Sequence, residues 1–160
     1  MSWLTPEPPA DHYVWLGKVA SACSMLEVQI EMIGWAWNHG QPWTDNWSEV
    51  AGSPGMARKL CEAALREMNP DLASEVSALL GDAALVREER NKFAHAVFIL
   101  DPTRPAGDQW ILKSARDVEF GPLIAEHGAR LVATSKQLSR RAEMLRVRAV
   151  QERSTQGQLT

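Results

Sequence analysis

An arginine, an asparagine and a histidine lie close together in the stretch "RNKFAH", which runs from Arg90 to His95. A histidine that titrates near neutral pH can act as a general acid or base. A guanidinium offers fixed, paired hydrogen-bond donors to phosphate oxygens, and an amide such as that of Asn91 can orient either partner. Together these side chains suit the binding of a phosphate group and proton transfer beside it. His95 would then move protons, and Arg90 would stabilise the charge that develops on the phosphate.

The helix that carries Arg90 is predicted from an apolar stripe. Asn69 followed by Pro70 has the pattern of an N-cap and a first helical residue. From there apolar side chains recur in steps of four and three residues, and the same spacing then leads to Arg90 and to Phe93. A permanent cation is therefore expected on the inner face of a helix. The stripe residues before it are Leu72, Val76, Leu79, Ala83 and Val86.

Helix geometry limits how the three side chains can form one site. On a straight α-helix a step of five residues is a rotation of about 140°, so Arg90 and His95 do not share a face. Asn91 and His95 do share one, because they are four residues apart. A single site therefore requires that the helix ends or bends near residues 93–95, that Arg90 reaches round, or that a second subunit supplies one partner.

Two further helices are predicted before this one. The first extends from Asp11, as N-cap, to Gly40, as the left-handed residue after its end. Ser53 and Pro54 predict the start of a short second helix that ends at about Met68. The stripe of the first helix consists of Val19, Cys23, Leu26, Ile30, Ile33 and Trp37.

After His95 the pattern changes. Two apolar runs, "AVFILD" and "WILK", flank a loop with proline and glycine and predict a small β-hairpin. A last helix is expected from Asp117 or Pro122 to about Gln151. Its predicted buried side consists of Phe120, Ile124, Leu131, Leu138 and Leu145.

These elements predict an all-α fold. We expect an up-and-down bundle of four to five helices, with the β-hairpin inserted after the third long segment. Residues 1–10 are expected to be an N-terminal extension, 11–151 the helical domain and 152–160 a disordered tail.

Composition limits the classes of protein. The chain has 160 residues, 45% of them apolar and 23% charged, which suits one soluble domain. The first residues lack the basic and apolar regions of a signal peptide, and charges interrupt the longest apolar segment. We therefore expect a cytoplasmic protein without a membrane segment. The two cysteines and four histidines lack metal-ligand spacing, so neither a zinc site nor another cofactor is predicted, and Cys23 is expected to be a buried thiol.

Charge is distributed unevenly. Residues 1–112 contain 8 basic and 15 acidic side chains, whereas residues 113–160 contain 9 basic and 5 acidic ones. The basic end could bind phosphates. A solvated helix face is the preferred interpretation, because such clusters are common on exposed helices.

The motif and its context closely resemble the HEPN superfamily (higher eukaryotes and prokaryotes nucleotide-binding), whose signature is R-x(4–6)-H, often with asparagine directly after the arginine. Here these residues are Arg90, Asn91 and His95 within "ALVREERNKFAHAVF". The segment "LGKVASACSMLEVQI", in which Glu27 follows Leu26, looks like a HEPN first helix. The fold-level resemblance covers roughly residues 12–150.

The resemblance implies a homodimer in which two motifs face one shared cleft. It implies a metal-independent endoribonuclease with RNA as substrate, often a toxin or antiviral effector, and an antitoxin or other regulatory protein as a partner. Other members of the superfamily have lost activity. A non-catalytic, dimeric binding or scaffold module is therefore the alternative, with Glu27 pairing Arg90 and His95 capping its helix. A helical-bundle interaction protein unrelated to the superfamily is a third interpretation.

The remaining histidines and the tryptophans have structural interpretations. His127 is expected to be a packed histidine with a hydrogen bond, and His12 and His39 are expected to cap helices or to be exposed. A group of tryptophans could stack bases, but closure of the bundle end or a subunit contact is preferred. This group consists of Trp35, Trp37, Trp43 and Trp47.

Overall fold

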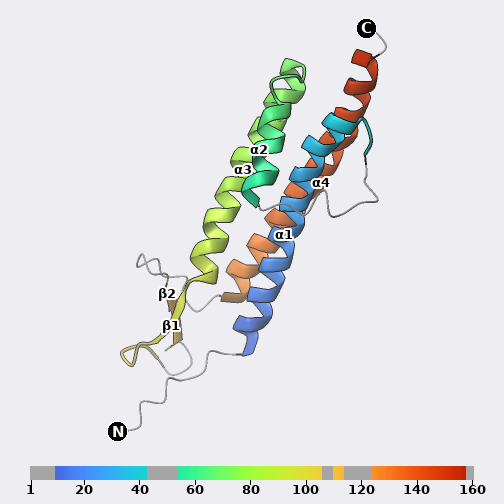
Figure 1. Ribbon diagram of the computed structural model, residues 1–160. Coiled ribbons are helices and arrows are strands. Elements are labelled where there is room, and N and C mark those ends of the chain that lie inside the picture. The colour runs from blue at the N-terminus through green and yellow to red at the C-terminus, as the bar shows by residue number, and fades with distance from the viewer. Residues whose placement is uncertain (1–9, 43–53, 106–109, 114–123, 158–160) are drawn as a thin grey trace.

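The computed structural model describes residues 10–42, 54–105, 110–113 and 124–157, and the predicted all-α class is confirmed (Figure 1). Between α3 and α4, a two-stranded antiparallel ladder places Val97 opposite Lys113. The elements in chain order are α1 (Ala10–His39), α2 (Pro54–Ala64), α3 (Pro70–Ala94), β1 (Val97–Leu100), β2 (Trp110–Lys113) and α4 (Ile124–Gly157).

The two longest helices, α1 and α4, lie side by side and run parallel (Figure 1). Cys23 Sγ on α1 lies 3.5 Å from Ser135 Oγ on α4. Further along both helices, Arg146 Nη1 donates a hydrogen bond to Gln29 Oε1 at 3.1 Å. α3 packs against both helices in the opposite direction.

The direction of α2 differs from the prediction. Arg58, near the start of α2, lies beside Ile30 of α1, and Trp37 Nε1 donates to Glu67 Oε2, just beyond the end of α2, at 3.2 Å. α2 therefore runs parallel to α1, and the up-and-down prediction is wrong for this pair. The length of the connection, residues 40–53, allows the start of α2 to lie beside the middle of α1, and the packing of α2 on α1 then determines its direction.

The predicted stripes meet in one hydrophobic core. All six stripe residues of α1 and all five of α3 are buried, as are Leu131, Leu138 and Leu145 of α4. Both cysteines are buried and free, as predicted for Cys23. Burial raises the pKa of the Cys61 thiol to about 12, with a smaller contribution from Glu62, so this group is a core side chain and not a nucleophile.

Some helix ends lie where the capping residues in the sequence predict them, and others do not. Asn69 caps α3, because its side chain accepts a hydrogen bond from the Leu72 amide at 2.9 Å. Gly40 has a φ of 67° after the end of α1, as expected of a C′ glycine. Asp11 is not the N-cap of α1, since the helix already includes Ala10. Ser53 lies outside the described residues.

Two helices end elsewhere than predicted. α2 ends at Ala64 and a turn follows, instead of continuing to about Met68. α4 continues to Gly157, so residues 152–157, predicted to belong to a disordered tail, are helical. The last turns of α4 are held by Asn69, the N-cap residue of α3. Glu152 accepts hydrogen bonds from the backbone and side-chain amides of Asn69. Within the four described ranges, no helix has both the length and the hydropathy that crossing a bilayer requires.

Candidate functional site

The predicted pairing of Arg90 with Glu27 is present. Arg90 Nη2 on α3 lies 3.8 Å from Glu27 Oε1 on α1, which is an ion pair but too long for a hydrogen bond. Arg87, one turn earlier on α3, donates from Nε to the same oxygen at 3.3 Å. One carboxylate therefore serves two guanidinium groups, and the net charge of the cluster is positive.

The guanidinium of Arg90 retains unused hydrogen-bonding capacity. Its side chain is 27% exposed, and its Nε is buried without a hydrogen-bond partner in the described part of the chain. The Glu27 side chain is 18% exposed. A buried donor without a partner is unfavourable, so such an atom in a folded protein requires an explanation. Nε itself is out of reach of solvent, so an oxygen from outside the chain could meet only the exposed part of the guanidinium.

A small cavity lies on the other side of the Glu27–Arg87 pair. Its volume is about 10 Å³, which is enough for approximately one water molecule. The cavity is therefore too small for a nucleotide, and a ligand of Arg90 would have to approach from the solvent. Its lining is Glu27, Ile30, Arg58, Leu80, Ala83, Ala84 and Arg87.

His95 lies where α3 ends. It is the C-cap residue, with φ −100° and ψ 9°, and its backbone amide donates to the Asn91 carbonyl at 3.0 Å. The helix therefore ends just before His95, which is one of the three solutions that the helix geometry allows. Both Asn91 and His95 are exposed, and neither side chain has a hydrogen-bond partner among the described residues.

The structure does not join the whole motif into one site within a single chain. Arg90 is directed to Glu27 on α1, while Asn91 and His95 lie on the solvent side of the same helix end. No contact joins the side chains of Arg90 and His95 in the described ranges. A single chain therefore has the ion-paired guanidinium of Arg90 and the exposed imidazole of His95 on consecutive turns.

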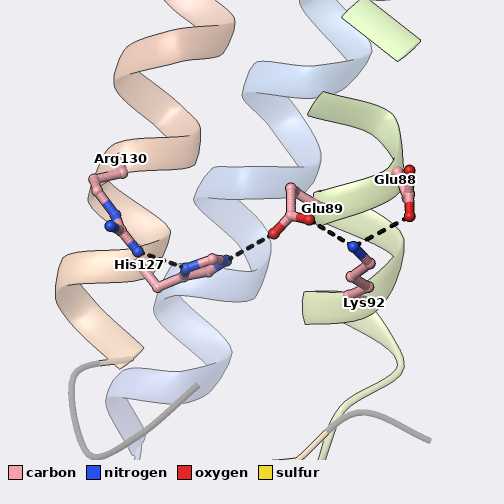
Figure 2. A network of polar contacts seen from close by, with 5 residues as sticks. All are labelled: Glu88, Glu89, Lys92, His127 and Arg130. Atoms are coloured by element: carbon pink, nitrogen blue, oxygen red, sulfur yellow. Dashed lines mark hydrogen bonds and ion pairs between the residues drawn. The ribbon is translucent and has the colours of Figure 1, made fainter. Parts of the chain in front are cut away.

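A second polar cluster lies between α3 and α4 (Figure 2). Arg130 Nη2 lies 3.0 Å from His127 Nδ1, and His127 Nε2 lies 3.9 Å from a Glu89 oxygen. Lys92 Nζ then bridges Glu89 at 2.7 Å and Glu88 at 3.1 Å. The predicted packed and bonded His127 is present, but its place in a series of polar contacts across two helices was not predicted.

Burial and the neighbouring Arg130 hold the pKa of His127 below its ordinary value, and Glu89 opposes them in part. The ring of His127 stacks on Phe93, with ring centroids 5.7 Å apart, and the ring of His12, on α1, lies 6.1 Å from that of Phe93. His12 is buried, so the prediction of a capping or exposed residue is wrong for it, and burial lowers its pKa. Both histidines are therefore mainly neutral at pH 7, and both pack against the core.

The two tryptophans near the end of α1 are structural. Trp37 is fully buried and bonded to Glu67, and Trp35 is 8% exposed and stacks on His39 at 4.5 Å. Neither ring is free to stack on a base, which is consistent with the preferred interpretation. Trp43 and Trp47 lie outside the described residues.

Two arginines that matter in the structure were not identified from the sequence. Arg87 lies one turn before Arg90, and an inspection of i−3 neighbours would have found it. Arg146 is buried in the middle of α4 although it follows a stripe leucine, and no local signal indicates this. Across residues 10–42, 54–105, 110–113 and 124–157, no three His, Cys, Asp or Glu side chains gather as metal ligands do.

Comparisons with known proteins give no match: no protein-family model, no curated protein and no solved structure matches this chain.

Proposed function

We propose that this protein is a HEPN-like, metal-independent endoribonuclease. In this proposal it acts in the cytoplasm as a homodimer of bundles of four to five helices, each with its hairpin insertion after the third long segment. It cleaves RNA by attack of a 2′-hydroxyl on the adjacent phosphate, giving a 2′,3′-cyclic phosphate and a 5′-hydroxyl. Arg90 stabilises the phosphate, His95 moves the protons and Asn91 orients His95 or the RNA.

The observation that supports this proposal best is the state of Arg90. It interrupts an otherwise apolar stripe, yet Glu27 contacts it at only 3.8 Å and its Nε lacks a hydrogen-bond partner among the described residues. A guanidinium placed only to close the core would be buried as that of Arg146 is, whose side chain is 2% exposed. Glu27 instead pairs with one end of the guanidinium, and the Arg90 side chain is 27% exposed.

The proposal includes a composite site. Because Arg90 and His95 do not converge within one chain, in the proposed homodimer the second subunit would supply the missing partner. Each cleft would combine Arg90 with His95 of the second copy, and the exposed Asn91 would lie at the joint. Metal ions have no role in this chemistry, because the substrate supplies the nucleophile and the protein supplies the charge and the proton transfer. In a cell, such an activity fits a toxin or an antiviral effector that an antitoxin or regulatory protein restrains.

The test is cleavage of mixed single-stranded RNAs in EDTA, with cyclic-phosphate ends detected on the products. We expect activity from the natural sequence and a loss of about 10²-fold or more from His95→Ala and from Arg90→Ala. His39→Ala and Arg66→Ala are matched controls, because both positions are exposed and lie near the opposite end of the bundle. Equal cleavage by the natural sequence and by His95→Ala, or no cleavage of any RNA, would contradict the proposal.

One observation favours the second candidate, a dimeric HEPN-like module that binds or scaffolds without catalysis. Glu27 already balances part of the charge of both Arg87 and Arg90, as structural ion pairs do. This module would be a dimer without ribonuclease activity. Sedimentation of the protein beside the cleavage assay separates the two, since both candidates require a dimer and only the first requires cleavage.

A further inference from the structure

A groove runs between the parallel helices α1 and α4, away from the Arg90 cluster. Its volume is about 740 Å³, far larger than the cavity beside Glu27. Met25 and Gln29 line it, and each lies two residues from Glu27, so the groove is on the opposite side of α1 from that carboxylate. Its lining on α1 is Trp15, Lys18, Ser21, Ala22, Met25 and Gln29, and on α4 it is Val132, Lys136, Ser139, Arg140 and Glu143.

The charge of this groove is not compensated. Lys18, Lys136 and Arg140 are exposed, and none of them has an ion pair in the part of the chain that the structure describes. The one carboxylate in the lining, Glu143, lies 3.7 Å from the buried Arg146 and so already has a cation. Three cations therefore face solvent along one groove with no carboxylate of their own.

The neighbouring face of α4 shows the opposite arrangement. Arg141 pairs with Asp82 at 2.9 Å, and Arg148 pairs with Glu75 at 2.6 Å, both across to α3. Arg141 and Arg148 are thus paired with carboxylates of α3, whereas Lys136 and Arg140, on the side of α1, have no ion pair in the described part of the chain. Of the nine basic residues in 113–160, Lys136 and Arg140 line this groove.

The floor of the groove adds flat and apolar contacts. Trp15 is half-buried and packs so closely on Gly128 that a Cβ there would lie 3.0 Å from the indole ring. Lys18 Nζ lies 4.5 Å above the same ring. Met25 is 54% exposed and lines the same groove. Cations that follow a backbone, beside exposed apolar side chains that can contact the bases, are components of a single-strand binding surface.

We propose that the α1–α4 groove binds a single strand of RNA outside the cleavage site. Lys136 and Arg140 are one helical turn apart, about 6 Å along the axis, and contact successive phosphates. A groove of this volume holds a few nucleotides of one strand, whereas a duplex rests on its rim. A second copy of the chain is a poor occupant, because a two-fold contact would place the same cations against one another.

This inference takes its ligand class from the proposed function, but binding does not require cleavage. The experiment uses a fluorescein-labelled, mixed-sequence 2′-O-methyl oligoribonucleotide, which lacks the attacking hydroxyl. Fluorescence anisotropy in EDTA gives Kd at several salt concentrations. For the double variant Lys136→Gln/Arg140→Gln we expect Kd to increase at least about tenfold at low salt. The slope of log K against log salt should decrease by about 1.4, because each phosphate that the protein neutralises on a single strand contributes about 0.7.

The matched control is Lys59→Gln/Arg66→Gln, which removes the same charge from exposed positions on and just after α2. It should leave Kd and the salt slope nearly unchanged, and thermal unfolding should confirm that both variants are folded. Equal weakening by the two double variants, or no binding by the natural sequence, overturns the inference. A change in sedimentation coefficient of the groove variant without a change in RNA affinity also overturns it, and identifies the groove as an interface between copies.

The outcome for the groove is distinguishable from that for the cleavage site. Cleavage that depends on His95, together with RNA binding that ignores Lys136 and Arg140, refutes the groove and preserves the ribonuclease. Binding that depends on Lys136 and Arg140 without any cleavage preserves the groove and refutes the ribonuclease.

Discussion

Two arginines occupy inner positions of this bundle, and their surroundings differ. The side chain of Arg146 on α4 is 2% exposed, donates to Gln29 at 3.1 Å and lies 3.7 Å from Glu143. The side chain of Arg90 on α3 is 27% exposed, and among the described residues its ion pair is the one with Glu27, at 3.8 Å. Arg146 is part of the core, whereas Arg90 is anchored at the edge of the core.

The difference separates a structural cation from an available one. A guanidinium taken out of water must be compensated inside the protein, so the buried Arg146 is expected to matter for stability. A partly exposed ion pair contributes little to stability. Stability therefore does not explain why Arg90 is present, whereas binding of a ligand by its guanidinium would. The comparison therefore predicts that stability depends on one arginine and activity on the other.

The largest expected effect is that of Arg146→Ala. The substitution removes a long stem packed in the core and leaves a cavity, which should decrease the free energy of unfolding by about 2–4 kcal/mol. Arg146→Met keeps most of the stem volume and should cost clearly less. Urea unfolding of both variants measures the difference. A loss below about 1 kcal/mol for Arg146→Ala would show that burial does not distinguish the two arginines.

A decrease in pH is expected to have an intermediate effect on the free energy of unfolding. It tests whether burial also disfavours the charged form of the histidines that lie between the helices. The pKa of His127 is lowered in the folded protein, whereas the unfolded chain titrates near 6.5. The unfolded state therefore binds more protons below that value, and stability should fall as the pH decreases from about 7 to 5. His12 acts in the same direction. Thermal unfolding across this range should show a weaker pH dependence in His127→Gln, and an unchanged slope would contradict the assignment.

The smallest effect on stability is expected at the candidate site. Arg90→Ala should change the free energy of unfolding by less than about 1 kcal/mol, because its ion pair is long and partly exposed. The same holds for Glu27→Gln, which keeps the shape of the side chain. Urea unfolding beside the RNA cleavage assay checks both. A loss as large as that of Arg146→Ala would make Arg90 a structural residue and remove the main support for catalysis.

The sequence predicted what depends on local spacing. The stripes of α1 and α3, the Asn69 cap, the Gly40 conformation and the end of α3 at His95 all follow from neighbouring residues, and the structure confirms them. The contact of Glu27 with Arg90 was also predictable, since both positions follow from the register of two stripes.

The features that were missed depend on partners far along the chain. The direction of α2 is determined by its packing on α1, and nothing in its own sequence indicates this. Arg146 is buried because Gln29 of α1 meets it, and α4 extends past Gln151 because Asn69 holds Glu152. His12 is buried because Phe93 lies beside it. Each of these requires knowledge of which helices touch.

The parallel contact of α1 with α4 has a consequence for synthesis of the chain. Cys23 meets Ser135, 112 residues later, and Gln29 meets Arg146, 117 residues later. While the ribosome extends the chain, the apolar side of α1 that α4 will cover has no permanent partner until the last helix emerges. Contacts between residues so far apart in the sequence form late, and proteins rich in such contacts fold slowly. The nascent chain is therefore open to chaperones and to aggregation for most of its translation, and folding is completed only after α4 has been released.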